Sequence, residues 1–195
     1  MGSPKALLPF GPERMLQRVV RLVGEAVPRE NIVVVAAAGQ ELPPLPGEVI
    51  VTHDRIKHRG PLEGLACGFA ALSERIDAAY ATSCDVPLLV PAFMERMFSL
   101  LGEHDIAVPK DKEFHHPLAA VYRVSVLSRI EQLLAADRLR TADLLDECDT
   151  FEVPVDELRS VDPKLQSLRN INQPNDYQAA LEAVGLDLSK SNFRT

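Results

Sequence analysis

The stretch Tyr80-Ala81-Thr82-Ser83-Cys84-Asp85-Val86-Pro87 combines a short β-favouring run with a carboxylate and with a proline that ends the run. If residues 80–84 form a buried strand, Asp85 lies at its carboxyl end, where open α/β sheets bind their ligands. A structural role is the alternative, because an aspartate ahead of a Val-Pro turn often caps that turn. The stretch by itself leaves both roles of Asp85 open.

Strand and helix patterns alternate on both sides of this stretch. Continuous β-branched runs at residues 31–36 and 48–52 predict strands that are covered on both faces, as in a parallel sheet. Apolar residues at spacings of three and four predict three helices, at residues 13–28, 60–76 and 91–101. Further along, the pattern predicts strands at 106–108, 118–122 and 151–155 and helices at 125–136, 141–147 and 176–184. This alternation predicts an α/β fold with a single doubly wound, mostly parallel sheet.

The length and composition favour one domain over residues 1–195. A chain of 195 residues with 46% hydrophobic residues can bury a sizeable core but is short for two domains. No linker rich in Gly, Pro or Ser divides it, and a polar tail is expected from about residue 186. Residues 1–11 resemble a loop, so we expect no strand ahead of the first predicted helix.

Charge and hydropathy exclude several classes of partner. A formal net charge of -7 argues against a broad nucleic-acid surface, which needs clustered Lys and Arg. No apolar run reaches the roughly 18 residues of a membrane helix, and no cleavable signal opens the chain. Three scattered cysteines fit reduced thiols better than a disulfide framework. We therefore expect a cytoplasmic protein without nucleic-acid or membrane partners.

Two carboxylates and a lysine are the candidate chemical groups. Asp54 and Asp85 each follow a β-favouring run, and Lys5 lies near a prolyl turn. Magnesium is commonly held by one or two carboxylates together with substrate phosphates, and a lysine can balance the remaining phosphate charge. The set suits phosphoryl or nucleotidyl transfer, although a solvated connecting loop is the more common role of a stretch such as residues 53–64. The dispersed histidines do not have zinc-ligand spacing, and Ser83 has no histidine partner that the sequence can place.

Five short motifs make the assignment more specific, and they occur in order along nearly the whole chain. They are Met-Gly-x-x-Lys-Ala-Leu-Leu-Pro-Phe at residues 1–10, Gly60-Pro61-Leu62-Glu63-Gly64-Leu65, Cys84-Asp85-Val86-Pro87, His116-Pro117-Leu118-Ala119-Ala120-Val121-Tyr122-Arg123 and Leu168-Arg169-Asn170-Ile171-Asn172-Gln173-Pro174. Together they resemble the motifs of the molybdenum cofactor guanylyltransferases. The first motif is shared by many nucleotidyltransferases of this fold, whereas the second, fourth and fifth point to the guanylyl branch.

The resemblance implies a fold and a reaction. The fold is the Rossmann-like nucleotide-diphospho-sugar transferase type. In the reaction, the phosphate of molybdopterin attacks the α-phosphate of GTP and releases pyrophosphate. The nucleophile is already anionic, so positioning and charge neutralisation carry the catalysis. Mg²⁺ is the implied cofactor, GTP and molybdopterin are the small-molecule substrates, and molybdoenzymes or their chaperones are implied as further partners.

The same resemblance assigns roles to nine residues. Lys5 would bind the nucleotide phosphates, and Asp85 would hold Mg²⁺; these two are the catalytic candidates. Asp54 would contact the nucleotide. The wall near the guanosine would be formed by Gly60, Pro61, Leu62 and Gly64, where missing side chains let a ligand approach backbone N–H groups. Asn170 and Asn172 would lie on the molybdopterin side.

The chain departs from the family's pattern at two places. The family begins with a strand and a Leu-Ala-Gly-Gly-x-Ser-x-Arg loop that wraps the phosphates, and this sequence starts just after that loop. Ala36, Ala37 and Ala38 also stand where the family has an asparagine. Three explanations of the start are open: an internal methionine taken as the start codon, which fits the family's own Met-Gly best, an expression scar at Met1-Gly2-Ser3, or a real loss of the strand. In each case we expect residues 1–195 to bind GTP poorly, because the strands beside the lost one keep unpaired edges.

Two further functions remain as alternatives. The sister family that transfers CMP to the same pterin shares the fold and the metal site. A degenerate relative could instead bind the pterin or a partner protein without turnover. A nucleotide competition assay separates the first alternative from guanylyl transfer, and the coding sequence ahead of Met1 bears on the second.

Overall fold

The computed structural model describes residues 4–73 and 75–186. The Met1-Gly2 part of the first motif lies outside the described residues, and so do residues 187–195, on which the expected polar tail falls. In the part that is described, no helix is long and apolar enough to cross a membrane.

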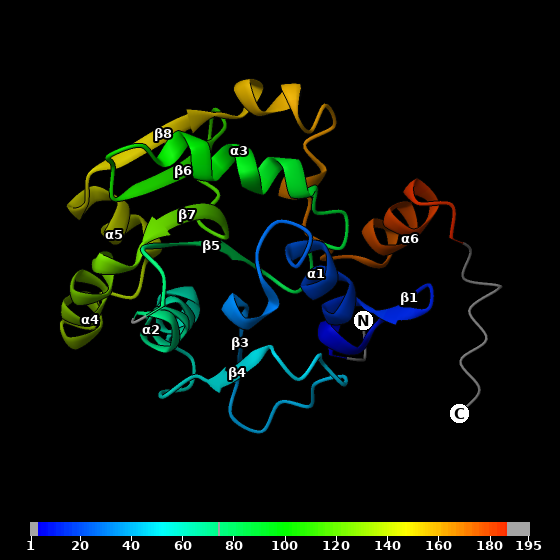
Figure 1. Cartoon of the computed structure of the whole chain (residues 1–195), viewed down its shortest axis with the longest axis horizontal. Helices are drawn as coiled ribbons and strands as arrows, with labels where there is room; N and C mark the ends of the chain where they lie inside the picture. Colours follow the sequence, from blue (N-terminus) through cyan, green and yellow to red (C-terminus); the bar gives the residue numbers. More distant parts are fainter. Residues whose placement is uncertain (1–3, 74, 187–195) are drawn as a thin grey trace.

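The central strands form a four-stranded group and a two-stranded group, which Figure 1 shows stacked one above the other. The larger group has the order β5 (Ala78–Thr82), β7 (Ala119–Arg123), β6 (Ile106–Lys110) and β8 (Thr150–Pro154). The smaller group pairs β3 (Val33–Ala36) in parallel with β4 (Ile50–His53). Only β7 runs against its neighbours, because residues 111–118 are too few for the crossover of about a dozen residues that a parallel pair needs.

Helices cover both faces of the larger group. One face packs against α2 (Gly60–Leu72), α4 (Leu127–Ala135) and α5 (Thr141–Glu147), and the opposite face packs against α3 (Pro91–Leu101). Helix α1 (Met15–Val23) packs against β3. The remaining elements are α6 (Pro174–Ala183), the hairpin β1 (Pro9–Phe10) and β2 (Glu13–Arg14), and the short 3-10 helices η1 (Lys5–Leu7), η2 (Arg29–Asn31), η3 (Val124–Val126), η4 (Val155–Ser160) and η5 (Gln166–Leu168). This two-sided covering buries nearly all of β6 and β7. The run at residues 48–52 was expected to be covered on both faces as well, but β4 has no buried residue, because it lies at the edge of the smaller group and exposes alternate residues.

The predicted α/β fold is confirmed. The strands form two groups rather than the expected single sheet, and the larger group is mixed rather than mostly parallel, because β7 is antiparallel to both of its neighbours; the other differences are local. Helices α3 and α5 have the predicted bounds, whereas the first helix ends at Val23 rather than near Pro28, because Gly24 is a poor helix former and begins a turn. The hairpin formed by β1 and β2 was not predicted, since each strand has only two residues. Strand β5 ends at Thr82, so Asp85 lies in the turn that follows the strand rather than at its last residue.

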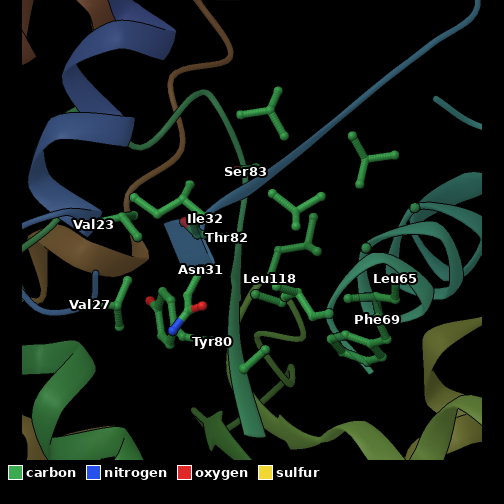
Figure 2. A pocket seen from close by; sticks show the side chains of 18 of the residues that line it. Val23, Val27, Asn31, Ile32, Leu65, Phe69, Tyr80, Thr82, Ser83 and Leu118 are labelled. Atoms are coloured by element: carbon green, nitrogen blue, oxygen red, sulfur yellow. The ribbon is translucent and has the colours of Figure 1, made fainter. Parts of the chain in front are cut away.

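A cavity of about 660 Å³ separates the two groups of strands. Among the described residues, no strand lies between β3 and β5, which agrees with the expected sheet that lacks its first strand. Figure 2 shows Val23 and Val27 on one side of β5 and Leu65 and Phe69 on the other, all lining this cavity. Two hydroxyl oxygens of β5, Tyr80 Oη and Thr82 Oγ1, are buried with no hydrogen-bond partner in the described part of the chain.

The buried hydroxyl of Thr82 predicts a stabilising substitution. We expect Thr82→Val to raise the free energy of unfolding by about 1 kcal/mol, because valine has the same shape and removes an unpaired buried polar group. The melting temperature should rise by about 2–4 °C. The matched control is Thr150→Val, which should lower the melting temperature, since Thr150 Oγ1 donates to the carbonyl oxygen of Leu145 at 2.9 Å. Calorimetry of both variants checks the pair, and a less stable Thr82→Val protein would contradict it.

Candidate active site

The carboxylate of Asp85 is bonded by side chains from three separate parts of the chain. Its Oδ2 accepts from Lys5 Nζ at 2.8 Å, and its Oδ1 accepts from Ser83 Oγ at 2.5 Å and from Asn170 Nδ2 at 3.2 Å. Asp85 is 8% exposed. In the hydrogen bonds of the described residues, the carboxylate accepts from no backbone N–H, so the turn-capping alternative has no support. The geometry makes Asp85 the centre of a side-chain cluster.

The ammonium group of Lys5 lies between two oxygens. Besides the contact with Asp85, Lys5 Nζ donates to Asn172 Oδ1 at 2.7 Å. Lys5 opens η1, so its side chain reaches the cluster from the amino-terminal end of the described chain. Oxygen atoms are the ligands that Mg²⁺ prefers, and few protein ligands are needed when phosphates supply the others. Asp85 Oδ2 and Asn172 Oδ1 therefore fit a hard divalent cation, provided that the lysine moves from between them.

The two asparagines are held in place by the backbone around them. The N–H of Ile171 donates to the carbonyl oxygen of Asp85 at 2.9 Å, and the Ile171 side chain is buried. Asp176 Oδ2 accepts from the N–H groups of Asn172 and Gln173, at 3.1 and 2.8 Å. These backbone donors lower the pKa of Asp176, so it is charged at neutral pH and fixes the start of α6. The segment 170–172 is thus positioned beside Asp85 by bonds that leave both amide side chains facing the cluster.

A second group of predicted residues lines the cavity beside this cluster. Asp54, Gly60, Pro61 and Gly64 form part of the cavity wall, together with Ser83 and Cys84. Gly60 has φ of 69°, a left-handed conformation that favours glycine at the start of α2. The stretch 83–85 belongs to both groups, because Ser83 lines the cavity and also bonds Asp85.

Leu62 differs from its neighbours in this second group. Its side chain is fully buried among the core residues under α2 and does not line the cavity. A role of Leu62 at the site is therefore restricted to its backbone and to anchoring the helix. The pKa of Asp54 is raised by burial and by the nearby charge of Glu63.

An ion-pair network fixes the loop that leads into α2. Glu63 is 2% exposed, and its Oε1 accepts from the backbone N and the Nε of Arg55, at 3.2 and 3.0 Å. Arg55 Nη1 also donates to Glu131 of α4 at 2.8 Å. Burial raises the pKa of Glu63, but the hydrogen bonds and the charge of Arg55 outweigh that effect, so the pKa is lowered overall. The carboxylate is charged at neutral pH and ties the backbone and side chain of Arg55 to the start of α2.

Sequence reasoning missed three residues that position the site. Ser83 was considered only as a hydrolytic nucleophile, although its place two residues before Asp85 allows it to bond that carboxylate. Asp176 has a readable signal, because an acidic residue three positions after Gln173 forms a capping box at the start of α6. Glu63 has no such signal, since nothing in a Gly-Pro-Leu-Glu-Gly stretch indicates that its glutamate is buried.

The family of the chain emerges from comparison with known proteins. The family model described as MobA-like NTP transferase domain matches residues 1–150. A protein of Mycolicibacterium paratuberculosis, named "Probable molybdenum cofactor guanylyltransferase", is 32% identical over 188 residues, which cover 94% of this chain and 89% of that protein. A protein of Methanosarcina mazei with the same name is 30% identical, with 93% of this chain and 86% of that protein covered.

Solved structures agree at the level of the fold. Molybdopterin-guanine dinucleotide biosynthesis protein A from Archaeoglobus fulgidus superposes with a TM-score of 0.73 at 22% identity, and the match covers 94% of this chain and 91% of that one. A cytidylyltransferase from Leptospira borgpetersenii matches with a TM-score of 0.66 at 18% identity, over 94% and 82% of the two chains. By its family model and its relatives, the chain belongs to the MobA-like NTP transferases and is a nucleotidyltransferase of the molybdenum cofactor guanylyltransferase type.

Proposed function

We propose that this nucleotidyltransferase transfers GMP from GTP to the phosphate of molybdopterin. A phosphate oxygen of the pterin forms the new bond to the α-phosphorus, the bond between the α-phosphorus and its bridging oxygen to the β-phosphate breaks, and pyrophosphate leaves. The observation that carries the proposal is the cluster of Lys5, Asp85, Asn170 and Asn172, which joins three distant segments through side-chain bonds of 2.7–3.2 Å. The names of the relatives agree with this choice of substrates.

The residues of the cluster would act mainly by neutralising the charge of the phosphates and by positioning the substrates. Once GTP enters, Lys5 would exchange its bonds to Asp85 and Asn172 for bonds to phosphate oxygens. Asp85 Oδ2 and Asn172 Oδ1 would then hold Mg²⁺ together with the phosphates. The bound ion would neutralise charge on the transferring group. No protein base is required, because the attacking phosphate is anionic at neutral pH.

The two asparagines would contact one substrate, and the residues at and before the start of α2 would contact the other. Asn170 and Asn172, beside Asp85, would donate and accept hydrogen bonds on the molybdopterin side. Asp54, Gly60, Pro61 and Gly64 would contact the nucleotide, because they line the cavity that reaches Ser83 and Cys84. Burial and the charge of Asp85 raise the pKa of the Cys84 thiol, so this cysteine stays neutral and is unsuited to nucleophilic attack.

We further propose that residues 1–195 work as one nucleotidyltransferase domain in the cytoplasm and deliver their product to molybdoenzymes or to the chaperones of those enzymes. The absence of a spanning helix among the described residues is compatible with this location. Guanylyl transfer is preferred to the CMP alternative because the matched relatives carry the guanylyl name. The cytidylyltransferase neighbour, at 18% identity, supports only the shared fold.

A nucleotide-selectivity assay tests the proposed reaction. Purified chain, Mg²⁺ and molybdopterin are incubated with millimolar GTP, CTP or both, and the dinucleotide product is identified by mass spectrometry. We expect the guanine dinucleotide from GTP and at least about tenfold less product from CTP, a discrimination of about 1.4 kcal/mol. Preferential product from CTP would favour the sister reaction, and pterin binding without product from either nucleotide would favour the non-catalytic relative.

Calorimetry tests the expected weakness of GTP binding separately. The cavity between β3 and β5 lies next to the cluster. A nucleotide bound there would therefore lack the contacts that a strand between β3 and β5 would make. We expect the dissociation constant of GTP for residues 1–195 to be far above the micromolar range. Micromolar binding would refute the expectation while leaving the proposed reaction intact.

A further inference from the structure

The guanidinium group of Arg18 makes two contacts at once. Arg18 lies in α1, and its Nε donates to the carbonyl oxygen of Pro87 at 2.6 Å. Its Cζ lies over the ring of Phe10, 4.8 Å from the ring centre. The side chain of Arg18 is 17% exposed, and Phe10 is fully buried. A planar guanidinium can stack on an aromatic face and donate a hydrogen bond in its own plane at the same time.

These two contacts join the two segments that form the ion pair of the site. Pro87 comes two residues after Asp85, in the segment that follows β5. Phe10 comes five residues after Lys5, and the 3-10 helix that Lys5 opens packs against α1. Arg18 therefore ties the segment that carries the lysine to the segment that carries the carboxylate.

A buried apolar cluster behind the site connects the third segment. Phe10 packs with Leu88, which follows the turn of Asp85, and with Ile171, which lies between the two asparagines. Tyr177 of α6 meets Phe10 edge-on, with the ring centres 6.4 Å apart. Apolar packing has little directional preference, whereas a hydrogen bond fixes the position of one acceptor atom. The bond from Arg18 thus adds a direction to contacts that are mainly apolar.

We propose that Arg18 is a positioning residue of the active site, which holds the turn of Asp85 at the distance from Lys5 that metal and phosphate binding require. The proposal rests on the proposed function, since that function gives the pair its role. Arg18 bonds neither member of the pair in the hydrogen bonds of the described residues. It acts through the backbone oxygen of Pro87 and the ring of Phe10, and so maintains the 2.8 Å contact between Lys5 Nζ and Asp85 Oδ2.

Arg21 provides a matched control for the charge of Arg18. It lies on the same helix, one turn further along, and carries the same charge. Its side chain is 42% exposed and pairs with Glu13 and Glu25, outside the cluster around Phe10. If Arg18 served only to attract phosphates, loss of the charge at either position should have a similar effect.

Nuclear magnetic resonance of the lysine ammonium groups tests the position of Lys5 without any substrate. An ammonium group that is held in an ion pair exchanges its protons slowly with water, and Lys5→Arg identifies the signal. We expect a slowly exchanging Lys5 signal in the full chain and at least about fivefold faster exchange in Arg18→Gln, comparable to the loss of one hydrogen bond. Arg21→Gln should leave the signal unchanged.

Guanylyl transfer at one fixed millimolar GTP concentration measures the consequence for the reaction. We expect Arg18→Gln to lower the rate at least about tenfold, because small displacements of catalytic groups are costly. Arg18→Lys should be intermediate, since an ammonium group can still donate to the oxygen of Pro87 but cannot also stack as a plane on Phe10. Arg21→Gln should stay within about twofold of the unsubstituted chain. Circular dichroism verifies the fold, and Arg18→Lys carries both measurements if Arg18→Gln does not fold.

Three results would each overturn the proposal. They are the absence of a slowly exchanging Lys5 signal in the unsubstituted chain, an unchanged Lys5 signal in the folded Arg18 variant, and equal losses in Arg18→Gln and Arg21→Gln. A chain that lacks guanylyl transfer, but whose Lys5 signal responds to Arg18→Gln and not to Arg21→Gln, would support the positioning of Lys5 by Arg18 and contradict only the proposed function.

Discussion

Replacing Asp85 with asparagine is expected to lower guanylyl transfer by at least about a hundredfold while leaving the fold intact, the usual scale for loss of an electrostatic group at a reacting phosphate. The carboxylate is 8% exposed and bonds Lys5 and Asn170. One substitution would therefore weaken both the proposed metal position and the placement of the lysine that we propose binds the phosphates. Asparagine keeps the size and one acceptor oxygen, and the backbone bond from Ile171 to the Asp85 carbonyl remains.

The Asp85→Asn variant and the unsubstituted chain are compared at the same millimolar GTP concentration, with circular dichroism to verify the fold. Binding of Mn²⁺ in the presence of GTP, followed by electron paramagnetic resonance, should weaken in parallel with turnover. Asp156→Asn is the matched control, because Asp156 is an exposed aspartate paired only with Arg159 among the described contacts, and it should retain full activity. Magnesium-dependent turnover that is unchanged in Asp85→Asn would remove Asp85 from the site.

The order of motifs along the chain predicted candidate residues for the site, but not the contacts between them, which the structure shows. Lys5, Asp85 and Asn170 are far apart in sequence, and no spacing rule connects them; only the family resemblance predicts them together, because each stands in one of its motifs. Their direct bonds depend on the docking of η1 and of segment 170–172 onto the turn after β5. The sheet itself was predictable, because β-branched runs and amphipathic spacing are local signals.

Local sequence patterns could not predict the cavity or the ion-pair network around Glu63. The unpaired edges of β3 and β5 were expected only from the family resemblance, because an open edge depends on which strands lie beside a segment and not on the segment itself. Glu63 lies in the stretch 53–64, for which a solvated loop was one of the two alternatives, yet its side chain is buried at the start of α2 and forms an ion pair with Arg55. Burial of a charge is decided by tertiary partners that have no fixed offset in sequence.

Arg55→Ala is expected to destabilise the fold, because it leaves the buried carboxylate of Glu63 without its ion-pair partner. Removing one partner of a buried ion pair commonly costs about 3–5 kcal/mol, and the partial exposure of Arg55, at 48%, reduces the expectation to about 2 kcal/mol at neutral pH. The variant leaves the Glu63 carboxylate buried without its main donor and also releases Glu131 of α4. The melting temperature should fall by about 4–8 °C.

The pH dependence of the stability of Arg55→Ala distinguishes the effect of an unpaired buried charge on Glu63 from a simple loss of packing. In the native chain the pKa of Glu63 is lowered, so the ion pair contributes stability above the ordinary pKa of a glutamate, and that contribution is lost as pH falls through the lowered value. In Arg55→Ala, burial instead raises the pKa of Glu63, so the loss of unfolding free energy should be largest near pH 7 and should shrink as acid protonates the carboxyl.

The double variant Arg55→Ala/Glu63→Gln should recover at least half of the loss at pH 7, because the buried charge is gone. Arg159→Ala, which breaks an exposed pair with Asp156, is the control and should change the unfolding free energy by less than about 0.5 kcal/mol. A deficit that is constant from pH 4 to 8 in chemical denaturation would show that Arg55 stabilises the loop by packing alone.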